Sequence, residues 1–484
     1  MNTSGNVNLF QWLPTEMICY IFDYLDLDTL KSVSLTCRRM ERIFSRYCCL
    51  RFTLYIENDR NLLPWRHRSS ARTTQSAESA AELLMHSTRY FQKVYLPVYS
   101  EFQRLNPDPM GTNCILYKVL ETDWLQQLVV LKLVMGSDSL QYAGQISTAV
   151  RRMDQLQELQ FMQTMYMPNL DICEDLRIES NTLQWLVLEV SIPSVINCPK
   201  LRKLDVASYL EAETYFGRQY AQHGDGEPFW KLKQLEEFTI MNQSMFRTLE
   251  CTEHRPGYKF KFYNHLTQLK KLHLYVAPVS EKFLQSICES CVHLEDLFIC
   301  TLQAIDPNSL RYLSNLPHLR RLAIWFTMTP HPVSFASVNV PKLEHLTLGM
   351  VDVVWKSLEK FQSIKSLSLI PHEHYRFLNA LCFVRLMKQL EFLWLDFRCI
   401  RDLRSIPAVL QELPLLRTLI LENVDVRWIY LSEMPPLPQL NRLVLYRCTA
   451  SQFWTLDARL FPNVKQVELA IPKCFSCDYK QRCR

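Results

Sequence analysis

One short pattern of apolar residues recurs through most of this 484-residue chain and constrains its fold more than any other feature. The pattern is LxxLxL or a close variant, and fourteen copies follow one another from Leu128 to Leu469. Their average spacing is about 26 residues, and from Leu269 onward the intervals are 21 to 26 residues. A regular period of this length is typical of an array in which each copy forms one structural unit and stacks on the next.

The pattern and its period indicate leucine-rich repeats. The last two apolar positions of each copy alternate, so they face one side of a short strand. Neighbouring strands are then expected about 4.8 Å apart in a parallel sheet, with residues 279–290 and 403–412 forming helices of the outer layer. The sequence therefore predicts an α/β solenoid over residues 120–484, with about 14 repeats, strands on the concave face and helices on the convex face.

The first fifty residues carry a different, helical pattern. Pro14 suits the first turn of a helix, because the missing N–H of proline would be unpaired there. Ile18, Ile21 and Leu25 then recur on one helical face, and either Asp26 or Asp28 can cap a second helix. Three short helices cannot bury all of these apolar faces. Something else is expected to cover part of them, although a simple helical cap on the next domain explains the pattern as well.

Residues 9–50 resemble an F-box, since the order, spacing and residue types of its motif agree. Met40 departs from the family, which usually has tryptophan there, and methionine can fill the same pocket. The resemblance implies three helices that bind the Skp adaptor of cullin-RING ubiquitin ligases. It does not separate residues that face the adaptor from residues of the F-box core. The residues expected in one role or the other are Leu13, Pro14, Ile18, Ile21, Leu25, Leu30, Val33, Cys37 and Met40.

Composition excludes several classes of function. Glycine occurs only 9 times, and no glycine-rich phosphate-binding motif is present. A net charge of +5 is too small to indicate nucleic-acid binding by the whole chain. The sequence shows no membrane-spanning stretch and no secretory signal, so we expect the 17 cysteines to be thiols in the cytoplasm or nucleus.

No catalytic signature was found, and the sequence predicts a protein that is not an enzyme and needs no metal or cofactor. The best zinc candidate is Cys474 and Cys477 with Cys483, which lacks a fourth ligand nearby. Residues 51–119 read as a linker and helical connecting region between the F-box and the repeats.

Substrate contacts are expected on the concave face of the repeats. Exposed aromatic residues on a sheet are enriched in binding hot spots, although inserts or the C-terminal tail could instead cover them. The candidates are Tyr275, Phe298, Trp325, Trp394 and Tyr446. A long insert over residues 241–266 adds Arg255, Lys259 and Lys261, which suit an acidic or phosphorylated peptide and, more weakly, RNA. Charged and aromatic residues alternate in this insert, and an ordinary edge strand explains that alternation equally well.

An F-box followed by leucine-rich repeats resembles the F-box/leucine-rich-repeat substrate receptors. The resemblance implies a non-catalytic subunit of an SCF-type ubiquitin ligase that binds the Skp adaptor and cullin-RING core through the F-box. The repeats would bind an unidentified target protein and so promote its ubiquitination and proteasomal degradation. The alternative is a leucine-rich-repeat interaction scaffold outside the ubiquitin system, in which the first fifty residues only cap the solenoid.

Overall fold

The computed structural model describes residues 12–51, 53–55, 91–98, 123–135, 139–163, 172–206, 232–241, 266–275, 281–301, 307–326, 332–349, 353–370, 380–396, 406–423, 436–447, 461–464 and 467–470. The chain forms two compact units, Met1–Gln234 and Leu235–Arg484.

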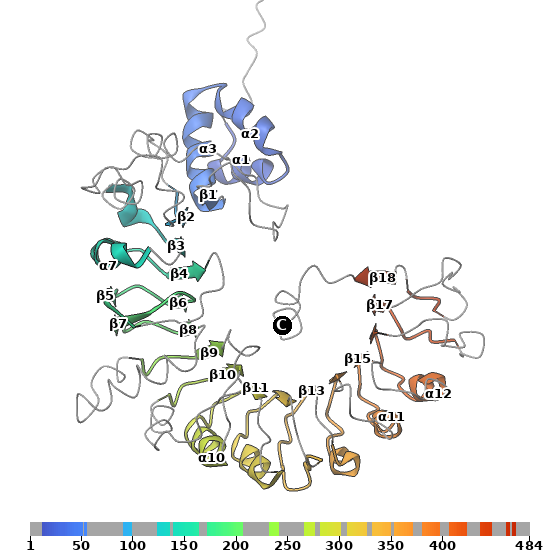
Figure 1. Cartoon of the computed structure of the whole chain (residues 1–484). Helices are drawn as coiled ribbons and strands as arrows, with labels where there is room; N and C mark the ends of the chain where they lie inside the picture. The colour runs from blue at the N-terminus through green and yellow to red at the C-terminus, as the bar shows by residue number, and fades with distance from the viewer. Residues whose placement is uncertain are drawn as a thin grey trace, which may run out of the picture. The chain divides into compact units, whose positions relative to one another are not determined.

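The first unit opens with three helices, α1 (Thr15–Phe22), α2 (Leu27–Ser34) and α3 (Arg38–Arg51), as the sequence predicts (Figure 1). Pro14 occupies the N-cap of α1. Asp26 caps α2, where its carboxylate accepts a hydrogen bond of 2.8 Å from the backbone N–H of Thr29. The helices enclose a core of their own, formed by Ile18, Phe22, Leu30, Met40, Ile43, Phe44, Tyr47 and Cys48.

A parallel sheet follows the helices in the first unit. Its strands, in spatial order, are β1 (Thr53–Tyr55), β2 (Lys93–Pro97), β3 (Val130–Met135), β4 (Glu158–Gln163), β6 (Trp185–Leu188) and β8 (Lys203–Val206). β1 and β2 fall within residues 51–119; β1 pairs in register with β2, and β2 pairs in register with β3. The strand array therefore begins before residue 120, where the repeats were expected to start.

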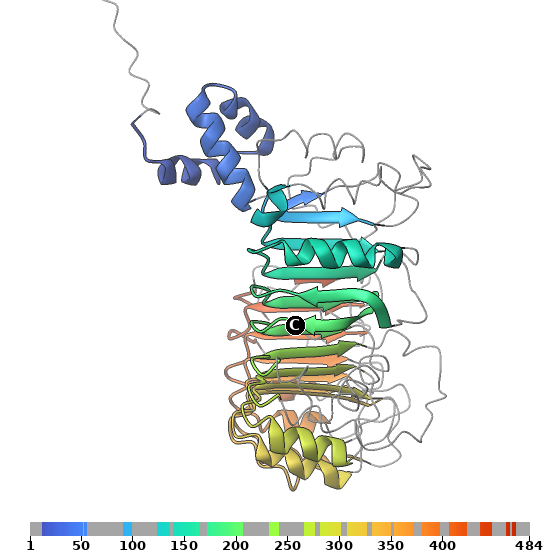
Figure 2. The same ribbon diagram turned by 90° about the vertical axis from the view of Figure 1, so that its left-hand side faces the viewer.

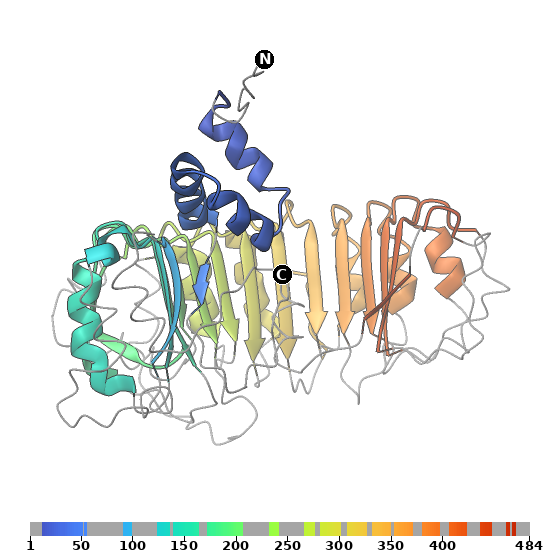
Figure 3. The same cartoon turned by 90° about the horizontal axis from the view of Figure 1, so that it is seen from above.

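The second unit continues the pattern with strands that pair in parallel in the order of the sequence (Figure 3). They are β9 (Glu237–Met241), β10 (Lys271–Tyr275), β11 (Asp296–Thr301), β12 (Arg321–Phe326), β13 (His345–Gly349), β14 (Ser366–Ile370), β15 (Phe392–Asp396), β16 (Thr418–Glu422), β17 (Arg442–Tyr446) and β18 (Val467–Ala470). The predicted leucine-rich-repeat solenoid is confirmed by this succession of parallel strands.

The repeated apolar residues form the core, as their spacing predicts. In the repeat of β12, for example, Leu319, Leu322 and Ile324 are all buried. Strand register places Leu322 opposite Leu297 of β11 and Leu346 of β13, so equivalent residues form continuous columns. Burying one such side chain contributes about 1.5–3 kcal/mol. No single repeat can bury its own apolar face, and the columns make each strand dependent on its neighbours.

The outer layer is mixed. In the second unit it contains helices, seen beyond the strands in Figure 1: α10 (Glu281–Ser290), α11 (Ala380–Val384), α12 (Ile406–Gln411) and the 3₁₀ helices η7 (Pro307–Asn315) and η8 (Trp355–Leu358). In the first unit it contains α7 (Ala143–Arg151) and the 3₁₀ helices η2 (Asp123–Gln127) and η3 (Ser139–Tyr142).

Two outer segments of the first unit are strands, where the prediction gave helices. β5 (Ile172–Glu179) and β7 (Ile192–Asn197) pair in parallel as a separate sheet beside α7 (Figure 2). The cause is local: Leu176 and Ile178 are buried while Arg177 between them is exposed, an alternation that suits a strand and not a helix.

One buried serine joins α7 to β5, and its removal should destabilise the first unit. The hydroxyl of Ser147 donates to the carbonyl of Ala143 at 2.7 Å and accepts from the backbone N–H of Arg177 at 2.8 Å. We expect Ser147→Ala to cost about 1–3 kcal/mol, because this N–H loses its acceptor inside the protein. Thr148→Ala is the control, since that hydroxyl is exposed and bonds only within α7. Urea unfolding of both variants checks this; equal stabilities would contradict it.

Candidate protein-interaction surfaces

The first helix, α1, carries apolar side chains on two faces. Ile18 and Phe22 point into the helical core. Met17, Tyr20 and Tyr24 are 50%, 57% and 73% exposed, at the i, i+3 and i+7 spacing of a second helical stripe. Tyr24 lies just past Phe22, the last residue of α1. We call these three residues the α1 stripe.

Two residues of the α1 stripe contact each other, and two further apolar residues of the helical domain are exposed. The rings of Tyr20 and Tyr24 meet edge to face with centroids 5.3 Å apart, and their hydroxyl oxygens are 2.8 Å apart. Trp12 and Leu35 are also open to solvent, with 79% and 84% of their surface exposed. Large apolar side chains concentrated on so small a domain are typical of a surface that binds a partner. The sequence analysis missed all five, although the second i, i+3, i+7 pattern on α1 could have revealed the stripe.

The nine residues predicted for adaptor binding divide into three groups. Ile18, Leu30 and Met40 are buried in the core of the three helices. Four others are half-buried, and these are Leu13, Ile21, Leu25 and Val33. Pro14 and Cys37 are exposed. Met40, the departure from the family, therefore packs inside the domain, where its flexible side chain fills the core.

Polar contacts hold the exposed face of the helices in place. Asp23, just after α1, accepts a hydrogen bond of 2.7 Å from the Tyr47 hydroxyl of α3 and lies 3.2 Å from the guanidinium of Arg51. Burial, together with the Asp23 hydrogen bond, raises the pKa of Tyr47 to about 12, so the hydroxyl stays a donor. Arg39 donates to the carbonyl oxygen of Leu13 at 2.6 Å, which ties the chain ahead of α1 to α3.

The strand face of the second unit is more closed than the sequence analysis expected. Tyr275, Phe298 and Trp325 are only 7%, 2% and 3% exposed, so the expectation that they are exposed is wrong. They form a cluster with Cys300 and Ile370. The ring centroids of Tyr275 and Phe298 are 4.5 Å apart. The register of β10 and β11 sets Tyr275 opposite Cys300 and Phe298 opposite His273, so the two rings meet diagonally across the strands.

A glycine of the next strand makes room for Trp325. Gly349 lies directly opposite Trp325 in the register of β12 and β13. A Cβ atom added to Gly349 would overlap the indole ring of Trp325. The indole therefore lies across β13, and it belongs to the same cluster as Ile370 of β14. The absence of a side chain at residue 349 is thus a condition for burying Trp325.

Two of the predicted aromatic residues remain partly accessible. Trp394 and Tyr446 are half-buried on β15 and β17, with ring centroids 6.4 Å apart and edge to face. The indole N–H of Trp394 donates to the buried carboxylate of Glu422 at 3.1 Å, which fixes the ring. Arg447 lies over the Tyr446 ring at 5.5 Å and is 3.9 Å from Glu422. We call Trp394, Tyr446 and Arg447 the aromatic–arginine patch.

The backbone at this patch has an uncommon conformation. Asn423 and Arg447, which directly follow β16 and β17, have φ angles of 55° and 51°. Asparagine adopts this left-handed region more readily than arginine does. Asn423 donates from its backbone N–H to the carbonyl of Tyr446 at 3.0 Å and from its side chain to the buried Asp396 at 2.9 Å. Non-glycine residues held this way are often found at functional sites.

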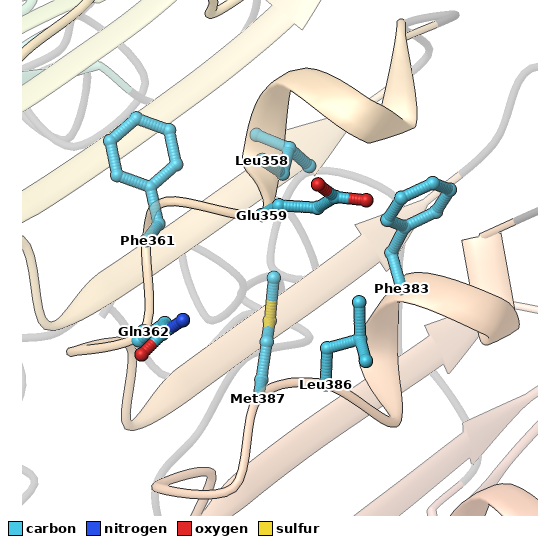
Figure 4. Close-up of a pocket in the computed structure, with 7 residues that line it drawn as sticks. All are labelled: Leu358, Glu359, Phe361, Gln362, Phe383, Leu386 and Met387. Carbon is cyan, nitrogen blue, oxygen red and sulfur yellow. The ribbon is translucent and has the colours of Figure 1, made fainter.

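Other features of the described residues offer little chemistry. Burial raises the pKa of the Cys198 and Cys291 thiols to about 12 each and raises the pKa of Cys288 as well, so these thiols stay protonated and weakly reactive. A cavity of about 10 Å³ lies between η8 and α11, lined by Leu358, Glu359, Phe361, Gln362, Phe383, Leu386 and Met387 (Figure 4). That volume is near the minimum for one water molecule and too small for an organic ligand.

Several predicted residues lie outside the described part of the chain. They are Arg255, Lys259 and Lys261 of the long insert, and Cys474, Cys477 and Cys483 near the C-terminus. Among the described residues, no group of three or more potential ligands is placed to hold a metal ion. Within the same residues, none of the helices has the length and apolar character needed to cross a membrane.

Comparison with known proteins identifies the helical domain. Residues 10–57 match the family model described as F-box-like. No curated protein shows significant sequence similarity to the chain. An F-box-like domain followed by repeats of this type supports a protein-interaction adaptor.

Solved structures that resemble this chain include an internalin (inlF) from Listeria monocytogenes str. 4b F2365. It is 13% identical, with a TM-score of 0.32, and the match covers 73% of this chain and 82% of the internalin. A structure of TLR13 in complex with ssRNA13 is also 13% identical, with a TM-score of 0.33, and the match covers 88% of this chain and 62% of that one. The fold assignment rests on strand register and not on these distant likenesses.

The contact between Trp325 and Gly349 gives a test of how the strand face is packed. We expect Gly349→Ala to lower the stability of the protein by about 1–3 kcal/mol, because the added methyl group overpacks a filled site. Gly144→Ala is the matched control: nothing lies within 4 Å of a Cβ there, and alanine should favour α7. Thermal unfolding compares the two. The packing described here would be refuted if Gly349→Ala were as stable as the wild type.

Proposed function

We propose that this chain is the substrate-recognition subunit of an SCF-type ubiquitin ligase. The F-box-like domain would bind the Skp adaptor, and through it the cullin-RING core, while the repeats bind a target protein. The single observation that carries the proposal is an F-box-like domain that closes its own core and still leaves the α1 stripe exposed, on a chain whose repeats form a leucine-rich-repeat sheet. The site of action would be the cytoplasm, the nucleus or both.

The adaptor interface is proposed to consist of the α1 stripe with Trp12, Pro14 and Leu35. These side chains are apolar and exposed, so covering them removes apolar surface from water, at about 25 cal/mol per Å². Of the nine residues expected from the sequence, the buried Ile18, Leu30 and Met40 would act indirectly, by holding the helices. The half-buried residues would lie at the margin of the contact.

The mechanism is proximity, and the chain itself performs no chemical step. A target held on the repeats has its lysines kept near a ubiquitin-charged enzyme, which raises the effective concentration of the two reactants. The chain would therefore be a non-catalytic subunit. The aromatic–arginine patch is the surface that we assign to target binding, since tryptophan, tyrosine and arginine are the residues most often found at binding hot spots.

An interaction scaffold outside the ubiquitin system remains the alternative. It shares the repeats and their binding surface and differs only in the role of the first fifty residues. Adaptor binding separates the two, because a scaffold has no need of it.

Removing the α1 stripe should weaken adaptor binding. We expect the triple variant Met17→Ala, Tyr20→Ala, Tyr24→Ala to bind a purified Skp adaptor at least about tenfold more weakly, because the loss of about 1.4 kcal/mol of apolar contact in total is tenfold in Kd. Leu386→Ala and Leu415→Ala are matched controls, since these leucines are 45% and 42% exposed on the repeats. Titration calorimetry measures the affinities. Unchanged binding by the triple variant would remove the adaptor from the proposal.

Target capture should depend on the aromatic–arginine patch and not on the F-box-like domain. We expect Tyr446→Ala to lose most of the proteins that co-purify with the wild type under proteasome inhibition, while its affinity for the adaptor is unchanged. Trp394→Ala should do the same, but it also deprives the buried Glu422 of a donor, so its thermal stability must be measured alongside. Retention of all captured proteins by a folded Tyr446→Ala variant would show that targets bind elsewhere.

A further inference from the structure

The residue directly before each strand from β9 to β16 is charged, and its sign alternates from one strand to the next. Before β9 to β12 these residues are Glu236, Lys270, Glu295 and Arg320. Before β13 to β16 they are Glu344, Lys365, Glu391 and Arg417. The alternation is unbroken until β17, which is preceded by the uncharged Asn441. We call this row of eight residues the charge ladder.

The backbone places consecutive members of the charge ladder side by side. The first residues of the strands are in register, so the residues before them are neighbours too. The carbonyl oxygen of Lys270, for example, accepts hydrogen bonds from the N–H groups of Glu295 and Asp296 at 2.8 and 3.0 Å. Every ladder carbonyl up to that of Arg417 accepts the same two hydrogen bonds, from two consecutive N–H groups of the next repeat. Each charged residue is thus fixed beside the ladder residue of the neighbouring strand.

Two neighbouring pairs of ladder side chains make direct contact. The Lys270 ammonium is 3.1 Å from a carboxylate oxygen of Glu236, and the Lys365 ammonium is 3.0 Å from Glu344. The hydrogen bond from Lys365 lowers the pKa of Glu344. The first residue of each strand from β9 to β12 has the same charge as the ladder residue before it. Among these, Lys271 lies 3.9 Å from Glu237 and Arg321 lies 3.5 Å from Asp296.

The alternating charge makes the adjacent strand a better neighbour than the strand two positions away. The buried columns cannot do so, because each repeat offers nearly the same leucine positions and would fit against any other. Strands that are next to each other carry opposite ladder charges, whereas strands two steps apart carry the same charge. A stack that omitted one strand would set Glu236 beside Glu295, or Lys270 beside Arg320. Like charges directly opposite each other in a sheet are destabilising.

We propose that the charge ladder disfavours stacks of the second unit in which one repeat is skipped and strands two steps apart become neighbours. The leucine columns supply the stability of the stack, and the ladder penalises pairing with the wrong repeat, which is specificity through disfavoured alternatives. The inference concerns folding and is independent of the proposed function.

Inverting the ladder in blocks tests the proposal without changing the net charge. The first block is Glu236→Lys, Lys270→Glu, Glu295→Lys and Arg320→Glu. The second block is Glu344→Lys, Lys365→Glu, Glu391→Lys and Arg417→Glu. Among the ladder residues themselves, each block alone creates one like-charge contact, between β12 and β13, and the two blocks together create none.

We expect each block alone to lower the Tm of the full chain by about 2–4 °C at low salt, and the eightfold variant to recover most of that loss. The differences should shrink in 1 M salt, where the Debye length is about 3 Å. If the eightfold variant instead loses the sum of the two block effects, the ladder does not match neighbours and the proposal fails.

A smaller cycle covers the case in which a block variant does not unfold cooperatively. Arg320→Glu and Glu344→Arg each create like-charge contacts, and the double variant restores the opposite-sign contact between β12 and β13. The proposal is supported if the double variant loses less Tm than the two single variants lose together, and if this difference shrinks at high salt. Additive losses overturn it.

Discussion

Hydrogen bonding between parallel strands in unbroken register is the constraint on which the repeat region depends. It sets every residue of a repeat beside its counterpart in the next repeat, about 26 residues away in sequence and about 4.8 Å away in space. Three kinds of row follow from this single constraint in the second unit. Leucines form buried columns, aromatic side chains from Tyr275 to Trp325 pack across strands, and charges alternate at the strand starts. The leucine and charge rows repeat one sequence choice in each repeat, whereas the aromatic cluster combines two different strand positions.

The F-box-like helices are stabilised differently, because three helices pack around one core and do not form a stack of repeats. Eight buried side chains form their core, and the polar contacts of Asp23 and Arg39 hold the helices together. A domain of this size cannot also bury the outer face of α1. The exposed stripe and the closed core are therefore two results of the same small size.

The sequence predicted what depends on a short pattern and missed what depends on distant neighbours. The strands of the large sheet from β3 onward and the three N-terminal helices follow from local spacing, so they could be read directly. The burial of Trp325 could not, since it depends on the missing side chain of Gly349 in the next repeat. β2 was missed because it lacks the full leucine pattern. β5 was missed because the alternation of Leu176, Arg177 and Ile178 lies between two copies of that pattern. Trp394 and Tyr446 were placed on the strand face by spacing, but the buried Glu422 that fixes Trp394 required coordinates.

The two-faced α1 helix also has a consequence for how much of this protein a cell can hold. The α1 stripe exposes apolar surface to water whenever nothing covers it. Copies made in excess of a covering molecule would adhere to one another or be retained by chaperones and degraded. Under the proposed function, the abundance of the chain would be tied to the supply of the partner that covers α1.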